Sequence, residues 1–232
     1  MYSCMATPFS AAIVDDRLRD LELVKTNLQK IKNCSILFTH TNPYHFFEHL
    51  NTTRHLPDIV ITDCQMPEID GMALTRLMKL FFPSIQIIVV SGLLVESDVA
   101  ELIDIGANAV IAKGSLQILN NQSLPLAIDA IQQNKVFIDP FWNQSLVQKM
   151  RKQTQKKKEE LKTPHFSQNE LKILQLLVTH PDYEKIAEFL NVSKRTVEGY
   201  VQKISEKTPD NSKKSKLIAY GLKHYLVHLF RG

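Results

Sequence analysis

The 232-residue sequence predicts a parallel α/β unit followed by a small all-helical unit. In the front half, five short apolar runs rich in Ile and Val alternate with amphipathic stretches, a pattern typical of buried parallel strands joined by helices. In the rear half, helical patterns follow one another. Charge divides at the same place, since residues 1–140 carry 10 Lys/Arg against 15 Asp/Glu and residues 141–232 carry 18 against 9. We therefore expect two domains, with the basic one meeting a polyanion such as nucleic acid, unless its lysines only form a solvated surface.

Strands and helices of the front half are expected to alternate five times. The expected strands span 10–14, 36–38, 58–62, 85–90 and 108–112, and the expected helices span 17–32, 43–50, 72–80, 97–105 and 116–133. Pro57 and Pro83 stand just before strands, where no helix continues, and Gly71 and Gly106 stand where a loop must turn or a helix must end. These units predict a five-stranded parallel sheet whose ligand crevice lies at the carboxyl ends of its strands.

Acidic residues follow two of these strands directly. Asp15 and Asp16 close the first strand, and Asp63 closes the third in ITDCQMPEIDG. The three carboxylates are expected to converge, and crowded carboxylates repel one another unless a divalent cation such as Mg²⁺ neutralises them. The sequence therefore predicts a phosphate site in which the Asp63 carboxylate can attack a phosphoryl group. Each acid could instead simply cap the helix that follows it.

Three further features follow Asp63 along the chain. They are the MP-x-x-DG sequence directly after it, Ser91 in VVSG, and Lys113. Together with the acids, these features make residues 9–134 resemble the receiver domain of two-component response regulators. The resemblance implies a flavodoxin-like (βα)5 fold in which a sensor histidine kinase phosphorylates Asp63.

The same resemblance gives each matched residue a role. Four groups are implied as Mg²⁺ ligands: the carboxylates of Asp15, Asp16 and Asp63 and the backbone carbonyl of Gln65. The metal would neutralise charge on the transferring oxygens. Lys113 would pair with Asp63 and later with a phosphoryl oxygen, although a lone lysine could equally be an exposed surface residue. Ser91 would donate to the phosphoryl group and draw its loop inward.

One position departs from the receiver pattern. The family couples the inward step to an aromatic residue three places before the lysine, and here that place is Val110. A valine cannot swing a large ring between exposed and buried positions. We therefore expect the loop after Ser91 to carry more of the coupling.

Residues 135–162 are expected to form a linker. The sequence KVFIDPFWNQSLV at its start resembles the short strand or turn and the Pro-started helix that follow receivers in this subgroup. Lys149 to Lys162 then contains seven Lys/Arg against two Glu. This composition favours an exposed helical or partly flexible segment that is solvated rather than bound to phosphates.

Four helices are expected in residues 163–232. Ser167 is a good N-cap with Glu170 three residues on, and it begins the first helix. The second helix is expected over about 183–190 and the third over about 193–207, which is helix-turn-helix spacing. A fourth, at roughly 214–230, presents an apolar surface suited to packing or to pairing with a second copy.

The sequence IAEFLNVSKRTVEGY is the strongest part of a second resemblance, to the LuxR/NarL-type DNA-binding domain. The resemblance places the third helix in the major groove. Five residues are expected to reach base edges: Thr196, Glu198, Gly199, Gln202 and Lys203. Three are expected to hold phosphates: Lys194, Arg195 and Lys207. Glu198 and Gly199 could instead be neutral surface, whereas Val197, Ile204 and Ile186 are assigned to the core.

These observations predict a DNA-binding transcriptional response regulator that is switched by phosphorylation of Asp63 and is not an enzyme. A homodimer on double-stranded DNA is expected, because a single small helix-turn-helix module buries little interface. Three cysteines without metal-ligand spacing fit a reducing compartment. The most apolar stretch, 85–95, is far shorter than a bilayer span, so we expect a cytoplasmic protein with no membrane contact.

Two other classes of function fit parts of the pattern. Aspartyl-phosphate hydrolases also place an Asp after a strand and use Mg²⁺, but they need an acid two residues later, where this chain has Gln65. A receiver-based protein-interaction switch, acting without phosphorylation or with weak DNA binding, would show no salt-dependent binding to duplex DNA.

Overall fold

The computed structural model describes residues 8–67, 69–160, 164–179, 182–208, 217–218 and 220–221. Within these residues, the front half contains one sheet in the strand order β2-β1-β3-β4-β5-β6. The strands are β1 (Phe9–Val14), β2 (Cys34–His40), β3 (Ile59–Asp63), β4 (Gln86–Ser91), β5 (Ala109–Ala112) and β6 (Phe137–Ile138). Every pairing is parallel. The carboxyl ends of the strands therefore share one edge of the sheet, as the sequence predicts.

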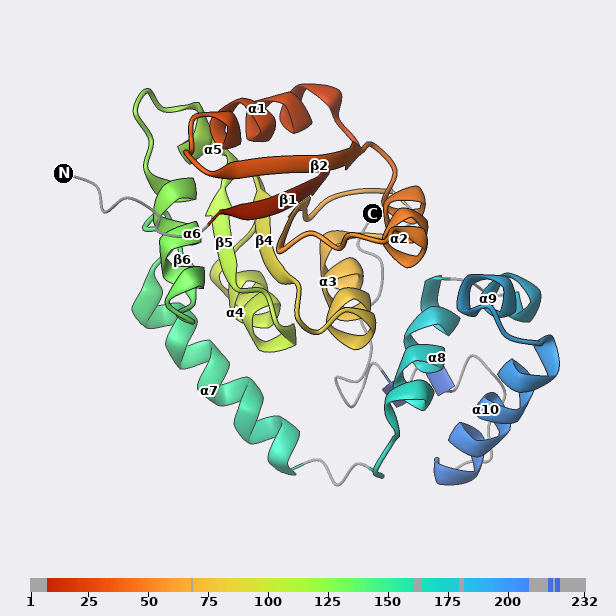
Figure 1. Ribbon diagram of the computed structural model, residues 1–232. Coiled ribbons are helices and arrows are strands. Elements are labelled where there is room, and N and C mark those ends of the chain that lie inside the picture. The colour runs from red at the N-terminus through yellow and green to blue at the C-terminus, as the bar shows by residue number, and fades with distance from the viewer. Residues whose placement is uncertain are drawn as a thin grey trace.

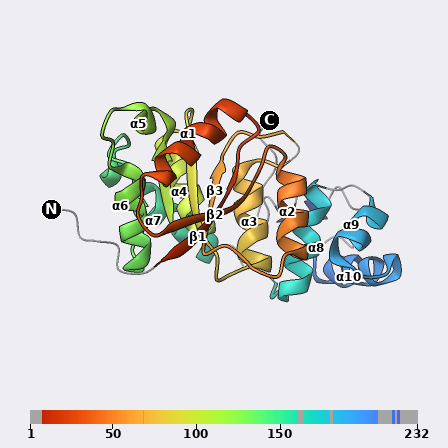
Figure 2. The same cartoon turned by 45° about the horizontal axis from the view of Figure 1, so that its top comes forward.

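Helices cover both faces of this sheet (Figures 1 and 2). One face is covered by α1 (Leu18–Gln29), α5 (Lys113–Gln117) and α6 (Ser123–Gln132), and the other by α2 (Pro43–Thr52), α3 (Gly71–Phe81) and α4 (Glu96–Ile105). Side chains of the strands alternate between the two faces. Ile61 and Ile88 pack in the apolar cluster beneath α1, α5 and α6, whereas their neighbours Val60 and Val89 pack in the cluster beneath α2, α3 and α4.

Two details differ from the predicted five β/α units. The short strand β6 adds a sixth strand beside β5, with Phe137 opposite Ala109 and Ile138 opposite Val110. The helix expected over 116–133 is divided into α5 and α6. Pro125 explains the division, because proline fits the first turn of a helix but would break its interior, and it lies in the first turn of α6.

The linker is the helix α7 (Gln144–Glu160), which packs along α4. Arg151 of α7 pairs with Asp104 of α4 at 2.9 Å, and Val147 is fully buried. One face of α7 is thus anchored to the receiver. From Gln144 to Glu160 the expected linker is a helix, one of the two forms that its composition favours, and before that helix residues 137–138 form β6.

The rear half contains α8 (Gln168–Thr179), α9 (Tyr183–Leu190) and α10 (Lys194–Lys207). Ser167 and Glu170 form the predicted capping box, since the Ser167 N–H donates to Glu170 at 2.6 Å and the Glu170 N–H donates to the Ser167 hydroxyl at 3.3 Å. Ser193 caps α10 by accepting from the Thr196 N–H at 3.1 Å. Most of the fourth helix expected at 214–230 lies outside the described residues.

The two domains share one apolar cluster. The ring of Phe189 on α9 stacks on Phe47 of α2 with centroids 4.8 Å apart, and the ammonium of Lys172 on α8 lies 4.4 Å from the ring centre of Phe81 on α3. Figure 1 shows α8 and α9 beside α2 and α3, with α10 farther from the sheet. Among the described helices, none combines the length and the apolar character that a membrane crossing requires.

Candidate functional site

The acidic site lies at the carboxyl ends of three neighbouring strands. Asp15 follows β1, Asp63 ends β3, and Lys113 follows β5 as the first residue of α5. One carboxylate oxygen each from Asp15, Asp16 and Asp63 lies within 4.8 Å of the other two. The structure therefore brings together the three acids and the lysine that the sequence singles out.

Lys113 occupies the centre of this cluster. Its ammonium lies 2.9 Å from Asp15 Oδ2, 3.1 Å from Asp63 Oδ2 and 2.8 Å from Asp20 Oδ2. Each ammonium N–H thus has a carboxylate partner. The side chain is buried, which excludes the alternative that Lys113 is an ordinary exposed lysine.

Asp20 is a member of the site that sequence reasoning missed. It lies in the first turn of α1, four residues after Asp16. Asp16 itself lies before the helix, so helical spacing from the predicted acids does not single out Asp20, and its contact with Lys113 arises only in the folded chain. The short lysine contact makes Asp20 the fourth carboxylate of the site.

Burial controls the protonation of this cluster. It raises the pKa of Asp15 to about 6, even though hydrogen bonds from Lys113 and from the Arg17 N–H act in the opposite direction. The pKa of Asp63 is also raised by burial, against the opposing effect of Lys113. Burial alone would lower the pKa of Lys113, but its bonds to Asp20 and Asp15 and the charge of Asp63 raise it overall. Buried acids of this kind gain from a nearby cation.

Two buried oxygens of the site have no hydrogen-bond partner within the described structure: Asp16 Oδ1 and Ser91 Oγ. A buried polar atom without a partner is costly, so each one suggests a missing ligand. For Asp16, an oxygen ligand set with few protein donors fits Mg²⁺, which keeps several of its waters. Asp15 Oδ1 accepts from the N–H of Arg17, the residue before α1, at 3.0 Å, but no side chain caps this helix end, and Oδ2 of Asp15 faces Lys113.

Asp70 and Gly71, the DG sequence after Asp63, hold the loop between β3 and α3 in place. Asp70 caps α3 by accepting from the Ala73 N–H at 2.8 Å, and the Gly71 N–H donates to the Cys64 carbonyl at 2.8 Å. A Cβ on Gly71 would collide with the Asp63 carbonyl oxygen and would lie 2.7 Å from the Cys64 Cα. Only glycine fits this close approach.

The second candidate site is the exposed surface of α10. Seven of the residues expected to meet DNA are exposed there: Lys194, Arg195, Thr196, Glu198, Gln202, Lys203 and Lys207. Gly199 is half-buried, and no atom lies within 4 Å of the position a Cβ would take. Val197, Ile204 and Ile186 are fully buried, as their assignment to the core predicts.

Two lysines of this set already have partners. Lys207 Nζ contacts both carboxylate oxygens of Glu170, at 2.8 and 2.7 Å, and thereby ties α10 to α8. Lys194 lies 2.8 Å from Glu184, but both side chains are largely exposed, and exposed ion pairs are weak. Lys194 can therefore turn to a phosphate easily, whereas Lys207 would first have to give up a structural contact.

Comparisons with known proteins match each half of the chain to a family. The family model "Response regulator receiver domain" matches residues 11–120, and the model "Bacterial regulatory proteins, luxR family" matches residues 164–220. The chain is 30% identical over 177 residues to the oxygen regulatory protein NreC of Staphylococcus epidermidis, covering 75% of this chain and 79% of that protein. The chain belongs to the response regulators with a LuxR-family DNA-binding domain.

More distant relatives share the same arrangement. The transcriptional regulatory protein DegU of Brevibacillus brevis is 23% identical, with 71% of this chain and 73% of that protein covered. A structure of RcsB from Salmonella enterica serovar Typhimurium, bound to a promoter in the presence of phosphomimetic BeF3⁻, has a TM-score of 0.52 at 21% identity and covers 94% of this chain and 100% of that chain. The latter likeness concerns the fold. With a receiver and a LuxR-family domain in one chain, the protein is a DNA-binding response regulator of a two-component system.

Val110 remains a departure for a response regulator of this kind. It is fully buried in β5, and its carbonyl accepts from the Asp139 N–H at 2.9 Å, next to β6. No ring is present at this place to alternate between two positions. The linker contacts the sheet here instead.

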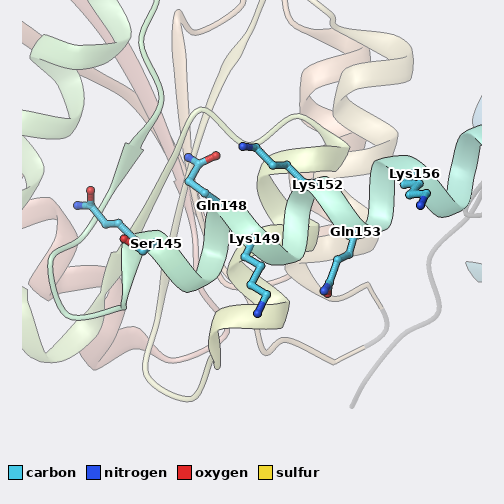
Figure 3. A pocket seen from close by; sticks show the side chains of 7 residues that line it. Ser145, Gln148, Lys149, Lys152, Gln153 and Lys156 are labelled. Atoms are coloured by element: carbon cyan, nitrogen blue, oxygen red, sulfur yellow. The ribbon is translucent and has the colours of Figure 1, made fainter.

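One hollow on the described surface lies away from the acids, along the solvent side of α7 (Figure 3). It has a volume of about 720 Å³ and is lined by Gln144, Ser145, Gln148, Lys149, Lys152, Gln153 and Lys156. Figure 3 shows these side chains extending to both sides of the helix, and none of them is acidic. We regard the hollow as the solvated face of the linker helix, whose opposite face packs on α4.

Proposed function

We propose that this response regulator accepts a phosphoryl group on Asp63 from a phosphohistidine of a sensor histidine kinase. The observation that supports this most directly is the contact of Lys113 with Asp63, at the same edge of the sheet as two buried oxygens, Asp16 Oδ1 and Ser91 Oγ, that have no partner among the described residues. An ion pair with a purely structural role would not require unsatisfied oxygens on Asp16 and Ser91. A phospho-acceptor site does, because it must receive a metal and a phosphoryl group.

In this proposal, Asp63 attacks the phosphorus of the donor, so that an O–P bond forms as the N–P bond to histidine breaks. Asp15, Asp16, Asp63 and the Gln65 carbonyl would hold Mg²⁺, which would supply positive charge to the transferring oxygens. Lys113 remains beside the acceptor and donates to a phosphoryl oxygen. The Ser91 hydroxyl, which has no partner among the described residues, then donates a hydrogen bond to the phosphoryl group and draws in the loop that follows β4.

The DNA-binding half acts through α10. Lys194 and Arg195 would contact phosphates at the start of the helix, and Thr196, Glu198, Gly199, Gln202 and Lys203 would face base edges, with Lys207 at the far end. We propose that two copies bind paired half-sites. A structure described as two RcsB dimers bound to two parallel DNAs, with a TM-score of 0.52 to this chain, supports that arrangement.

Two experiments test this function. The protein and an Asp63→Asn variant are treated with a small phosphodonor and Mg²⁺, and covalent phosphate is measured by intact mass. Label is expected on the native chain alone, and equal labelling of both would refute the acceptor assignment.

Binding to duplex DNA is measured separately over a range of salt concentrations. Binding that weakens with salt and is lost in the Arg195→Ala, Lys203→Ala variant supports DNA recognition by α10. Unchanged binding in this variant would place the DNA contact elsewhere. An absence of binding would favour the protein-interaction switch.

A further inference from the structure

We infer that Trp142 is a latch through which the loop after Ser91 moves the linker helix α7. The inference rests on the proposed phosphorylation of Asp63 and names the path by which that event leaves the receiver. The latch would take over the coupling that the buried Val110 cannot provide, because a valine has no ring to move.

The latch is a single hydrogen bond between the linker and the signalling loop. The indole N–H of Trp142 donates to the Leu94 carbonyl at 3.0 Å, and the Trp142 side chain is only 4% exposed. Leu94 belongs to the loop between β4 and α4, three residues after Ser91. A displacement of this loop therefore has to stretch the bond or carry the indole with it.

Ser91 provides the reason for the loop to move. Its hydroxyl is buried and has no hydrogen-bond partner in the described part of the chain, and, apart from Gly92 and its chain neighbours, no described atom lies within 4 Å of the position that a Cβ on Gly92 would take. A phosphoryl group on Asp63 would offer an acceptor to this hydroxyl. The backbone from Ser91 to Leu94 would connect that hydrogen bond to the one between Leu94 and Trp142.

Other contacts hold α7 to the same region of the receiver. The Asp139 N–H donates to the Val110 carbonyl at 2.9 Å, so the segment before α7 is attached to β5 at the place of the missing aromatic residue. Farther along, Arg151 pairs with Asp104, which is almost fully buried, at 2.9 Å. Together with the bond at Trp142, these contacts attach α7 and the segment just before it to β5, to the loop and to α4.

The helix also leads toward the DNA-binding domain. It runs to Glu160, and α8 begins at Gln168. A shift at Trp142 can therefore be carried along α7 as far as Glu160, without any ring moving inside the sheet. The response of the receiver would be read by the linker.

Trp142 is also a built-in reporter, because it is the only tryptophan in the chain. Full-length protein is titrated with beryllofluoride and Mg²⁺ while tryptophan emission is recorded. A saturable change in emission is expected for the native protein, none for Asp63→Asn, and a much smaller one for Ser91→Ala. Emission that stays constant while Asp63 takes up phosphate from a small donor would overturn the latch.

A second measurement removes the hydrogen bond without removing the ring. Hydrogen exchange of residues 92–95 and 144–156 is followed with and without beryllofluoride in the native protein, in Trp142→Phe and in a matched control, Phe141→Leu. Phe141 is the neighbouring aromatic residue, and it is 71% exposed. We expect beryllofluoride to change the exchange rates of α7 by roughly 5-fold or more in the native protein and the control, and by much less in Trp142→Phe.

The outcomes separate the latch from the function on which it rests. If the loop responds in Trp142→Phe but α7 does not, the latch is supported. If α7 responds as strongly in Trp142→Phe as in the native protein, the latch is wrong although phosphorylation is real. If neither segment responds in any variant and no label reaches Asp63, the proposed function fails and the latch fails with it.

Discussion

At the scale of single residues, the acid site is organised around one lysine. Lys113 contacts Asp15, Asp20 and Asp63 at 2.8 to 3.1 Å, so its charge is shared among a proposed metal ligand, a residue with no proposed role and the proposed phospho-acceptor. A metal that enters must compete with this ammonium for Asp15 and Asp63. Asp20 offers the lysine a partner outside that competition.

We predict that Asp20→Asn weakens Mg²⁺ binding by about 3- to 10-fold, because one negative charge is lost and Lys113 turns more fully toward Asp15 and Asp63. Titration calorimetry of the full chain measures the effect. Glu22→Gln is the matched control, since Glu22 lies on the same helix and its exposed side chain pairs only with Lys25 among the described ion pairs. Equal affinities in the two variants would show that Asp20 has no influence on the metal.

Asp15 gives the site a pH dependence whose sign follows from burial. Its pKa is raised from 3.8 to about 6, so the folded state favours the protonated acid. The stability that this protonation contributes is complete below about pH 4 and is lost as the pH rises through about 6. In metal-free buffer at pH 7.5, we therefore expect Asp15→Asn to be more stable than the native protein by roughly 1 to 3 kcal/mol.

Urea unfolding of both proteins at pH 4.5 and pH 7.5, with chelator present, measures this difference. The advantage of Asp15→Asn should shrink at the lower pH, where Asp15 is itself protonated. An advantage of the same size at both values would mean that the substitution acts through packing rather than through charge.

At the scale of elements, the loop between β3 and α3 has the tightest fit. Gly71→Ala would drive a methyl group into the backbone of Asp63 and Cys64, and backbone cannot yield as a flexible side chain does. We expect a loss of about 2 to 4 kcal/mol in the free energy of unfolding, because overpacking forces a backbone shift.

Gly114→Ala provides the comparison for this loop. Gly114 lies in α5, and nothing comes within 4 Å of the position of its added Cβ. Alanine is favoured over glycine inside a helix by roughly 0.5 to 1 kcal/mol. Denaturant unfolding should thus move in opposite directions for the two variants, and a Gly71→Ala protein of native stability would contradict the close approach.

Local patterns predicted the elements of the fold and most of the site. The apolar runs predicted β1 to β5, and residues at the ends of these strands supplied Asp15, Asp63, Ser91 and Lys113. The prediction of one helix over 116–133 was wrong, because the helix breaks there between α5 and α6, and Pro125 marks the start of the second helix. The burial of Lys113 could not be predicted, because it depends on α1 bringing Asp20 across to the start of α5, 93 residues later in the chain.

At the scale of the whole molecule, the domains meet through α2 and α3 on one side and α8 and α9 on the other. This contact leaves the outer face of α10 exposed (Figure 1). The receiver therefore does not cover the residues that would read DNA. Its influence has to come from how it positions the second domain, which α7 and the aromatic contact at Phe189 both determine.

We predict that Phe189→Ala separates the domains without changing the DNA surface. Phe189 stacks on Phe47 and lies 6.2 Å, edge to face, from Phe81, and aromatic pairs contribute about 0.5 to 1.5 kcal/mol beyond their buried area. Without this ring, the radius of gyration in small-angle scattering should increase, and thermal unfolding should divide into two transitions. Phe141→Ala, which removes an exposed ring from the linker, should do neither.

Phe189→Ala also distinguishes a receiver that positions the DNA-binding domain from one that covers α10. Because α10 is already exposed, releasing the domain should leave the affinity for non-specific duplex DNA within about 2-fold of the native value, since that affinity depends on accessible basic side chains. A large gain in affinity on release would show instead that the receiver screens α10 in solution. The domain contact would then inhibit DNA binding directly, and the exposed face of α10 would not describe the resting protein.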